Sequence, residues 1–155
     1  MALRKIRLEG DPILRKKARE VENVDDRVKT LLDDMVDTMN EANGIGLAAP
    51  QVGILRRVIV IDIGDGPIKL INPEFVDKNG EQVEVEGCLS IPNLAGTVKR
   101  PNWVKIKYID INNEERIIEG DGLLARVLCH EIDHLDGILY TDKVIEYVDL
   151  EEEGE

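Results

Sequence analysis

The stretch HEIDH, from His130 to His134, contains the only two histidines of the 155-residue chain. Residues four apart on an α-helix lie within about 40° of each other around the axis, so both imidazoles can reach one point. Glu131 sits roughly 80° from the middle of the pair, where it can contact a ligand bound beside them. This H-E-x-x-H pattern predicts two histidines that bind a divalent metal ion and a glutamate that transfers protons. The alternative is a helix with two ordinary surface or core histidines.

A metal site with one open position needs a third protein ligand. The acidic candidates that follow the motif are Asp136, Asp142, Glu146 and Asp149. The glycine and third histidine of the extended zinc-protease pattern are absent, and Cys129 points roughly 120° away from the histidine pair. Cys88, in EGCLSIP, is left as the predicted third ligand, and its alternative role is that of a small buried hydrophobe. A thiolate beside two imidazoles suits Fe²⁺, Zn²⁺, Ni²⁺ or Co²⁺ without deciding among them.

A third stretch, GIGLAAPQVG from Gly44 to Gly53, combines closely spaced glycines with alanines. Such residues let the backbone come very close to whatever lies opposite. Dinucleotide and phosphate loops are excluded, because G-x-G-x-x-G and a loop lysine are both missing. The stretch is typical of a tight loop that pairs edge-on with a peptide, followed by the amide of Gln51, which can donate to an oxyanion. The alternative is a close-packed turn with a surface glutamine.

Length and charge limit the kind of partner. A formal net charge of −12 over 155 residues argues against nucleic acid and anionic membrane surfaces, which leaves small substrates or peptides. The basic opening MALRKIRLEGDP lacks the apolar stretch of a signal peptide, and the longest apolar runs are too short to span a bilayer. With two cysteines, the chain is expected to be cytoplasmic with reduced thiols. We expect one domain over residues 1–150 and a solvated acidic tail at 151–155.

Hydrophobic periodicity predicts an α+β fold. A short helix is expected to begin at Pro12, and a longer one follows an Asp25 N-cap and stops at Gly44. Strands are expected at 57–63, 68–72, 81–87, 104–108 and 114–120. A last helix starts after Asp121 and ends at Gly137. We expect short antiparallel or mixed sheets to pack around this last helix, which carries H-E-x-x-H.

The motifs GIGLAAPQ, EGCLS and HEIDH together resemble the three signature motifs of peptide deformylases, in the same order and at similar separations. The resemblance covers nearly the whole chain up to Gly137. It implies a metal-dependent hydrolase that removes the N-formyl group from the initiator methionine of nascent polypeptides and releases formate. It also implies one divalent metal ion per chain, natively Fe²⁺, which Zn²⁺, Ni²⁺ or Co²⁺ can replace.

The resemblance assigns roles to single residues. The implied metal ligands are Cys88, His130 and His134, and Glu131 is the implied proton carrier. The side chain of Gln51 and the backbone N–H of Leu89 are implied to stabilise the oxyanion.

Helical spacing and the motifs together predict a pocket for the methionine side chain. Residues on the face of His130 and in the glycine loop line it: Ile45, Leu123, Arg126 and Val127. The stem of Arg126 is expected to form apolar wall while its head reaches water. Gly46 and Gly87 are expected to offer backbone groups to the peptide. An ion pair between Glu86 and Arg100 is expected to brace the segment that holds Cys88.

The expected partners are N-formylmethionyl nascent peptides, with transient proximity to the ribosome, no nucleic acid, no membrane and a monomeric state. Two departures from the family stand out. Cys129 occupies a position where the family often has glutamine, which is expected to change packing or oxidation behaviour near the metal. The chain also ends acidic where some members have a basic helix, so docking to the ribosome through such a helix is not expected.

Two other functions remain open at this stage. A zinc metallopeptidase would need a third histidine or glutamate ligand and would not need Cys88. A non-enzymatic module with a fully coordinated structural metal would make Glu131 dispensable.

Overall fold

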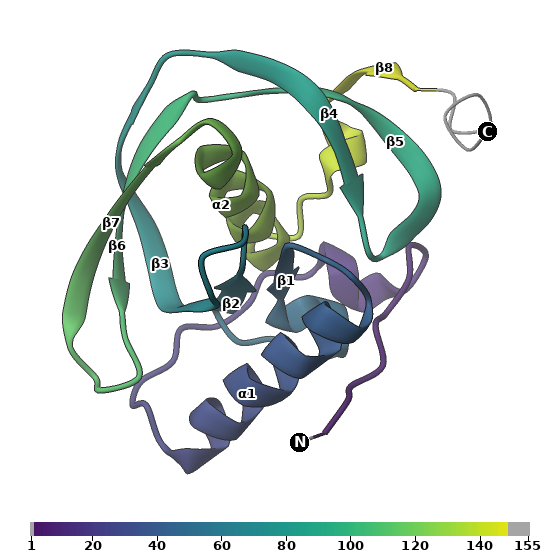
Figure 1. The fold of residues 1–155 in the computed structure, drawn as a ribbon. Helices are drawn as coiled ribbons and strands as arrows, with labels where there is room; N and C mark the ends of the chain where they lie inside the picture. The colour runs from purple at the N-terminus through teal and green to yellow at the C-terminus, as the bar shows by residue number, and fades with distance from the viewer. Residues whose placement is uncertain (1, 149–155) are drawn as a thin grey trace.

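The computed structural model describes residues 2–148, so the acidic tail expected at 151–155 lies outside the described residues. These residues form two antiparallel sheets and two α-helices (Figure 1). One sheet has five strands in the order β1-β2-β3-β6-β7, with bounds Gly46–Ala48, Val58–Ile61, Ile68–Asn79, Trp103–Ile109 and Glu115–Asp121. The other has three strands in the order β4-β5-β8, with bounds Gln82–Cys88, Ile91–Arg100 and Val144–Tyr147. The predicted α+β class is confirmed.

Helix α2, Gly122–Leu135, lies near the middle of the molecule, and the strands curve around it (Figure 1). Most of its apolar positions are buried against the five-stranded sheet in one core cluster, to which α2 contributes Ala125, Val127, Leu128, Cys129, Ile132 and Leu135. The sheet side of the same cluster includes Ile59, Ile61, Leu70, Val104 and Ile106. Burying one large aliphatic side chain contributes about 1.5–3 kcal/mol to stability. Together these buried side chains hold α2, which carries H-E-x-x-H, against the sheet.

Helix α1, Asp26–Glu41, packs its apolar stripe on the other face of the five-stranded sheet. The predicted N-cap is confirmed, because the Asp25 carboxylate accepts a 3.0 Å hydrogen bond from the N–H of Val28. The predicted stop at Gly44 is placed too late. The helix ends at Glu41, and Asn43 adopts the left-handed conformation with φ 58°. Asparagine tolerates this conformation better than most residues.

The described residues also form short 3₁₀-helices. Pro12–Arg15 confirms the predicted short helix at Pro12, with the Asp11 carboxylate as N-cap acceptor. Ala49–Val52 and Tyr140–Asp142 form two more. The predicted strands and the end of α2 near Gly137, which has φ 74°, are present, but β5 and β8 were missed. Gly44–Gly53 is not a simple loop, since it contains β1 and the 3₁₀-helix Ala49–Val52.

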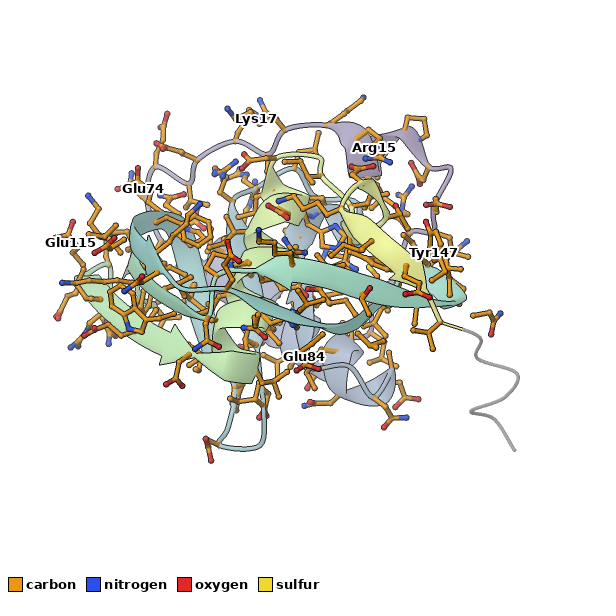
Figure 2. All side chains as sticks on the ribbon, turned by 90° about the horizontal axis from the view of Figure 1, so that it is seen from above. Arg15, Lys17, Glu74, Glu84, Glu115 and Tyr147 are labelled. Carbon is orange, nitrogen blue, oxygen red and sulfur yellow. The ribbon has the colours of Figure 1, made fainter. Side chains whose placement is uncertain are left out.

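The side chains of Glu74, Glu84 and Glu115 lie on the outer surface of the sheets (Figure 2). On the solvent face of β6, the Lys107 ammonium lies 3.5 Å from a carboxylate oxygen of Glu74 and 3.7 Å from one of Glu115. The strand expected at 104–108 is therefore present as β6, with Lys107 on its exposed side. In the part of the chain that the structure describes, no helix combines the length and the apolar character needed to cross a bilayer.

Candidate active site

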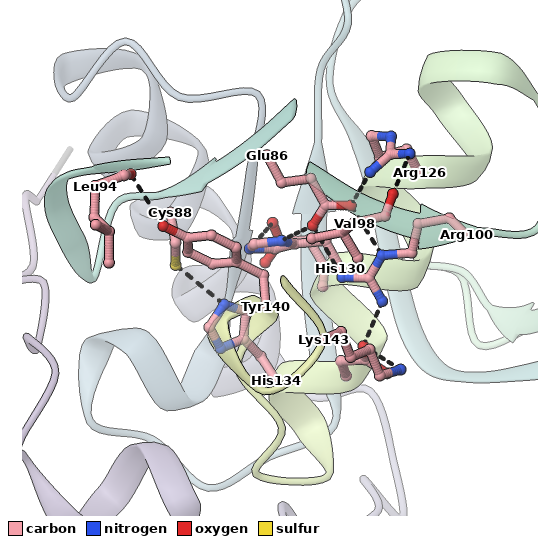
Figure 3. Close-up of polar contacts among 12 residues, drawn as sticks. Glu86, Cys88, Leu94, Val98, Arg100, Arg126, His130, His134, Tyr140 and Lys143 are labelled. Atoms are coloured by element: carbon pink, nitrogen blue, oxygen red, sulfur yellow. Dashed lines mark hydrogen bonds and ion pairs between the residues drawn. The ribbon is translucent and has the colours of Figure 1, made fainter. Parts of the chain in front are cut away.

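Helix α2 and the end of β4 bring Cys88, His130 and His134 together. The Cys88 Sγ and one nitrogen from each imidazole all lie within 4.8 Å of one another. The Sγ of Cys88 is 3.3 Å from Nε2 of His134 (Figure 3). The two histidines come from successive turns of α2, and the cysteine comes from the neighbouring sheet. The residues that the sequence singles out from two distant motifs therefore converge.

This donor set fits a divalent cation. Two ligands of one tetrahedral ion, a sulfur at 2.3 Å and a nitrogen at 2.1 Å, are separated by roughly 3.6 Å, close to the Cys88–His134 distance. Burial lowers the pKa of His134 well below its usual value, and the nearby His130 lowers it further. His134 is therefore neutral, as a ligand must be.

The second histidine is oriented by a carboxylate. The Nδ1 of His130 lies 2.9 Å from Oε1 of Glu86, so its Nε2 is left for the cation. A carboxylate on the far nitrogen of a ligating imidazole fixes the tautomer and the ring orientation. Burial alone would raise the pKa of Glu86, but hydrogen bonds from Arg100 and His130 lower it to about 2. Glu86 is thus a permanent anion at neutral pH.

The predicted pair of Glu86 and Arg100 is confirmed. Arg100 donates from Nε and Nη2 to the two oxygens of Glu86, each at 2.9 Å, and both side chains are buried. Its remaining nitrogen, Nη1, lies 2.6 Å from Oδ2 of Asp133, which also receives the Lys143 ammonium at 3.0 Å. The pair therefore links β4 and β5 to α2 at the level of the histidines (Figure 3).

Glu131 lies beside the donor set without belonging to it. Its Oε2 is 3.9 Å from Nε2 of His130, and its Oε1 is buried with no hydrogen-bond partner among the described residues. Burial raises the pKa of Glu131 to about 7. A Cβ on Gly46 would lie 2.5 Å from Oε2, so Glu131 is the group that the glycine stretch approaches. A carboxyl group with a pKa near neutrality suits proton transfer in both directions.

Gln51 is not a surface glutamine, since only 1% of it is exposed. Its Oε1 accepts from the N–H of Ala48 at 2.9 Å, and its Nε2 donates to Oγ of Ser90 at 3.0 Å. The same Nε2 lies 3.6 Å from Sγ of Cys88. The amide is therefore fixed with its donor end toward the metal-binding residues.

A pocket of about 440 Å³ opens beside these groups. It is bordered by the six residues predicted to bind substrate, which are Ile45, Gly46, Gly87, Leu123, Arg126 and Val127. It is also bordered by Gln51, Cys88, Leu89, His130 and Glu131. His134 lies behind this lining and is 1% exposed. The sequence therefore selected residues that the fold gathers around one cavity.

One expectation about this pocket is wrong. The head of Arg126 does not reach water, because the residue is only 4% exposed and its guanidinium binds Glu86, Gln82 and the carbonyl of Val98. An anion buried on the adjacent strand attracts the head inward. The pattern of charges on β4 contained the signal, since Glu86 and Gln82 lie on the same face of that strand.

Two residues near the site were not predicted to have a role there. Ser90 is fully buried and receives the Gln51 amide, and its place within EGCLS was an available signal. The ring of Tyr140 stacks on His130 at 6.0 Å, while its hydroxyl donates to the carbonyl of Leu94 at 3.0 Å. No motif in the sequence marks Tyr140. Cys129 is buried in the core cluster between α2 and the five-stranded sheet, and burial raises its pKa to about 11.

Comparison with known proteins identifies the family. The model of the family described as "Polypeptide deformylase" matches residues 3–149. The chain belongs to the peptide deformylase family. A peptide deformylase from Acetivibrio thermocellus is 60% identical over 152 residues, which cover 98% of this chain and 89% of that protein. One from Caldicellulosiruptor bescii is 61% identical, with 98% and 92% covered. The crystal structure of the Thermotoga maritima deformylase superposes with a TM-score of 0.91 at 41% identity, covering 93% of this chain and 99% of that one.

Membership of the deformylase family establishes the reaction. The chain is a hydrolase that removes the N-formyl group from nascent polypeptides, as the three motifs implied. The two alternatives, a zinc metallopeptidase and a non-enzymatic metal module, are thereby excluded as functions. The Cys/His/His group is the metal-binding candidate that this metal-dependent family requires.

Proposed function

We propose that Cys88, His130 and His134 hold one divalent metal ion, natively Fe²⁺, and that Glu131 carries the proton of the deformylation reaction. The observation that carries this proposal is the convergence of one sulfur and two imidazole nitrogens within 4.8 Å. A mixed sulfur and nitrogen set also accepts Zn²⁺, Ni²⁺ or Co²⁺. Three protein ligands leave one position open, which distinguishes a catalytic from a structural site.

A divalent cation held by Cys88, His130 and His134 would supply Lewis-acid chemistry, polarising the formyl group and making water a nucleophile at neutral pH. Glu131 accepts the proton that the water loses as its oxygen bonds to the formyl carbon. Glu131 then gives that proton to the amine nitrogen as the carbon–nitrogen bond breaks, and formate and the free N-terminus leave. The pKa of about 7 caused by its burial supports both transfers.

The oxyanion that forms during attack needs hydrogen-bond donors. We assign this role to the Nε2 amide of Gln51 and the backbone N–H of Leu89, both of which border the pocket. The fixed orientation of Gln51 between Ala48 and Ser90 supports it, because a donor held in place needs no reorganisation during the reaction.

The substrate is an N-formylmethionyl peptide. The methionine side chain fits the pocket that Ile45, Leu123 and Val127 line together with Arg126. Strands β1 and β4 are edge strands of different sheets, and both border this pocket, at Gly46 and Gly87 respectively. An extended peptide can therefore add to both edges through its main chain, while the pocket selects its first side chain.

The cellular setting follows from the substrate. We propose that the enzyme acts in the cytoplasm as a monomer with a single catalytic domain, residues 1–150, and meets nascent peptides close to the ribosome without binding nucleic acid or membrane. The formal charge of −12 supports the lack of a nucleic-acid interface. Size-exclusion chromatography against standards of known mass tests the monomeric state. An elution volume that corresponds to a dimer would contradict it.

The metal proposal is tested with protein purified without oxygen. We expect about one iron per chain by elemental analysis and formate release from a formyl-methionyl peptide. Removal of the ion by a chelator should abolish release, and Fe²⁺, Zn²⁺, Ni²⁺ or Co²⁺ added back singly should restore it to different extents. Full activity in metal-free protein would contradict the proposal.

A further inference from the structure

The guanidinium of Arg126 uses each of its nitrogens within the protein. Its Nε lies 3.1 Å from Oε1 of Gln82, its Nη2 lies 2.9 Å from the carbonyl oxygen of Val98, and its Nη1 contacts Oε2 of Glu86. Arg126 and Glu86 are only 4% and 6% exposed. A buried arginine whose three nitrogens each have a partner is held in one geometry, since rotation would leave buried polar groups without partners.

The same carboxylate connects Arg126 to a metal-ligand candidate. Glu86 contacts Arg126 through Oε2 and His130 through Oε1, at 2.9 Å from Nδ1 (Figure 3). Arg126 and His130 are one turn apart on α2, while Glu86 comes from β4. Arg126 on α2 therefore holds the Glu86 carboxylate of β4. This carboxylate in turn orients the imidazole of His130 on the same helix.

We propose that Arg126 is a positioning residue for His130, acting through Glu86. This inference rests on the proposed function, because it assumes that His130 is a ligand. Arg126 keeps the Glu86 carboxylate aimed at Nδ1, which keeps the proton on that nitrogen and leaves Nε2 for the cation. It does not touch the reacting atoms itself.

Arg100 alone does not provide this control. It binds both oxygens of Glu86 but comes from β5, and its other donor goes to Asp133. Arg100 thus ties the carboxylate directly to β5, and to α2 only through the further contact with Asp133. Arg126 fixes it relative to the helix turn that carries His130, which is the geometry on which the hydrogen bond to Nδ1 depends.

Gln82 makes the anchor rigid. Its Nε2 donates to the carbonyl of Gly122 at 2.7 Å and to that of Pro101 at 3.2 Å, so its Oε1 is directed at Arg126. Gly122 is the first residue of α2. Gln82 therefore ties the arginine to the start of the helix, and the position of the guanidinium follows that of α2.

The test compares Arg126→Met, Arg126→Lys and the control Arg57→Met in Zn²⁺-loaded protein. Methionine keeps an apolar wall without donors, and lysine keeps the charge if methionine prevents folding. Arg57 is a matched control because it is also largely buried and binds the carbonyl of Leu135 at the other end of α2, away from Glu86. The chain has two histidines, so ¹⁵N-histidine-labelled protein gives imidazole signals from two residues only. Once the signals of one histidine are assigned, the remaining signals belong to the other.

In the wild type and in Arg57→Met, we expect a hydrogen-bonded His130 Nδ1 proton that exchanges slowly with water. In Arg126→Met, this proton should exchange at least tenfold faster, and the Kd for Zn²⁺ should rise about 10–100-fold. Arg126→Lys should give an exchange rate and a Kd between those of the wild type and those of Arg126→Met. Unchanged proton exchange and Kd in Arg126→Met, or in Arg126→Lys alone if methionine does not fold, would overturn the proposal. These readouts do not involve turnover, so a wild type that binds Zn²⁺ but releases no formate would refute the proposed function and leave this result standing.

Discussion

The backbone of Gly46 on β1 lies so close to the side chain of Glu131 on α2 that any Cβ at position 46 would displace that side chain. An added Cβ would lie 2.5 Å from the Oε2 atom of Glu131 and 2.9 Å from its Cγ. The glycine-rich motif thus meets the catalytic helix through the backbone. The relationship explains why a small residue is needed at one position of GIGLAAPQ and gives a direct prediction.

Gly46→Ala should lower kcat for deformylation by one to two orders of magnitude, because the methyl group displaces the Glu131 carboxylate, and misplaced reacting groups cost about 100-fold. The donor set does not include Glu131, so metal content should be unchanged. Steady-state kinetics with a formyl-methionyl peptide and elemental analysis measure both. Wild-type kcat in Gly46→Ala would show that Glu131 needs no fixed position.

Glu131→Gln should retain the metal and lose turnover. The amide keeps the shape of the side chain but cannot accept the proton from water, and a general acid–base group contributes about 10²–10⁴-fold to the rate. Formate release and metal content are measured on the same sample. A variant that keeps the wild-type rate would remove Glu131 from the mechanism, whereas loss of metal would indicate that Glu131 is a ligand.

Gln51→Ala should reduce kcat by about 10²–10³-fold, the usual effect of removing one oxyanion donor. It should also destabilise the fold by about 1–3 kcal/mol, because the buried N–H of Ala48 loses its acceptor. Gln51→Glu separates the effects, since its carboxylate still accepts from Ala48 but cannot donate. Equal activity of Gln51→Glu and wild type would contradict the assigned role.

Arg100→Met should lower the free energy of unfolding by about 3 kcal/mol, because it leaves the buried carboxylate of Glu86 with fewer donors. The control is Arg116→Met, whose pair with Asp110 is exposed to solvent and should contribute much less to stability. Denaturant unfolding of both variants gives the comparison. Equal losses in the two would show that burial of the Glu86 pair has no energetic consequence.

The sequence predicted the parts of the fold that depend on local pattern. The α1 stripe, its Asp25 cap, α2 and the alternating strands β4 and β6 are all present, because hydrophobic periodicity and capping act within a few residues. Strand β5 was missed because IPNLAGTVKR contains proline, asparagine and glycine and does not alternate. Its pairing with β4 and β8 stabilises it, and that is a tertiary effect.

In the candidate site, too, local patterns were predictable from the sequence and tertiary contacts were not. Spacing on one helix brought His130 and His134 together, and the motifs supplied Cys88 and Gln51. The inward turn of Arg126 was not predictable from helical position, because it depends on Glu86 being buried on a strand 40 residues away in sequence. The stacking of Tyr140 on His130 likewise depends on how the chain returns after α2.

The most direct test of the central claim is X-ray absorption at the metal edge of Zn²⁺-loaded protein, in the wild type and in Cys88→Ala. The account predicts one sulfur at about 2.3 Å and two imidazole nitrogens at about 2.0–2.1 Å in the wild type. Cys88→Ala should lose the sulfur shell, bind Zn²⁺ much more weakly and release no formate. A wild-type metal shell without sulfur, or full metal binding and activity in Cys88→Ala, would contradict it.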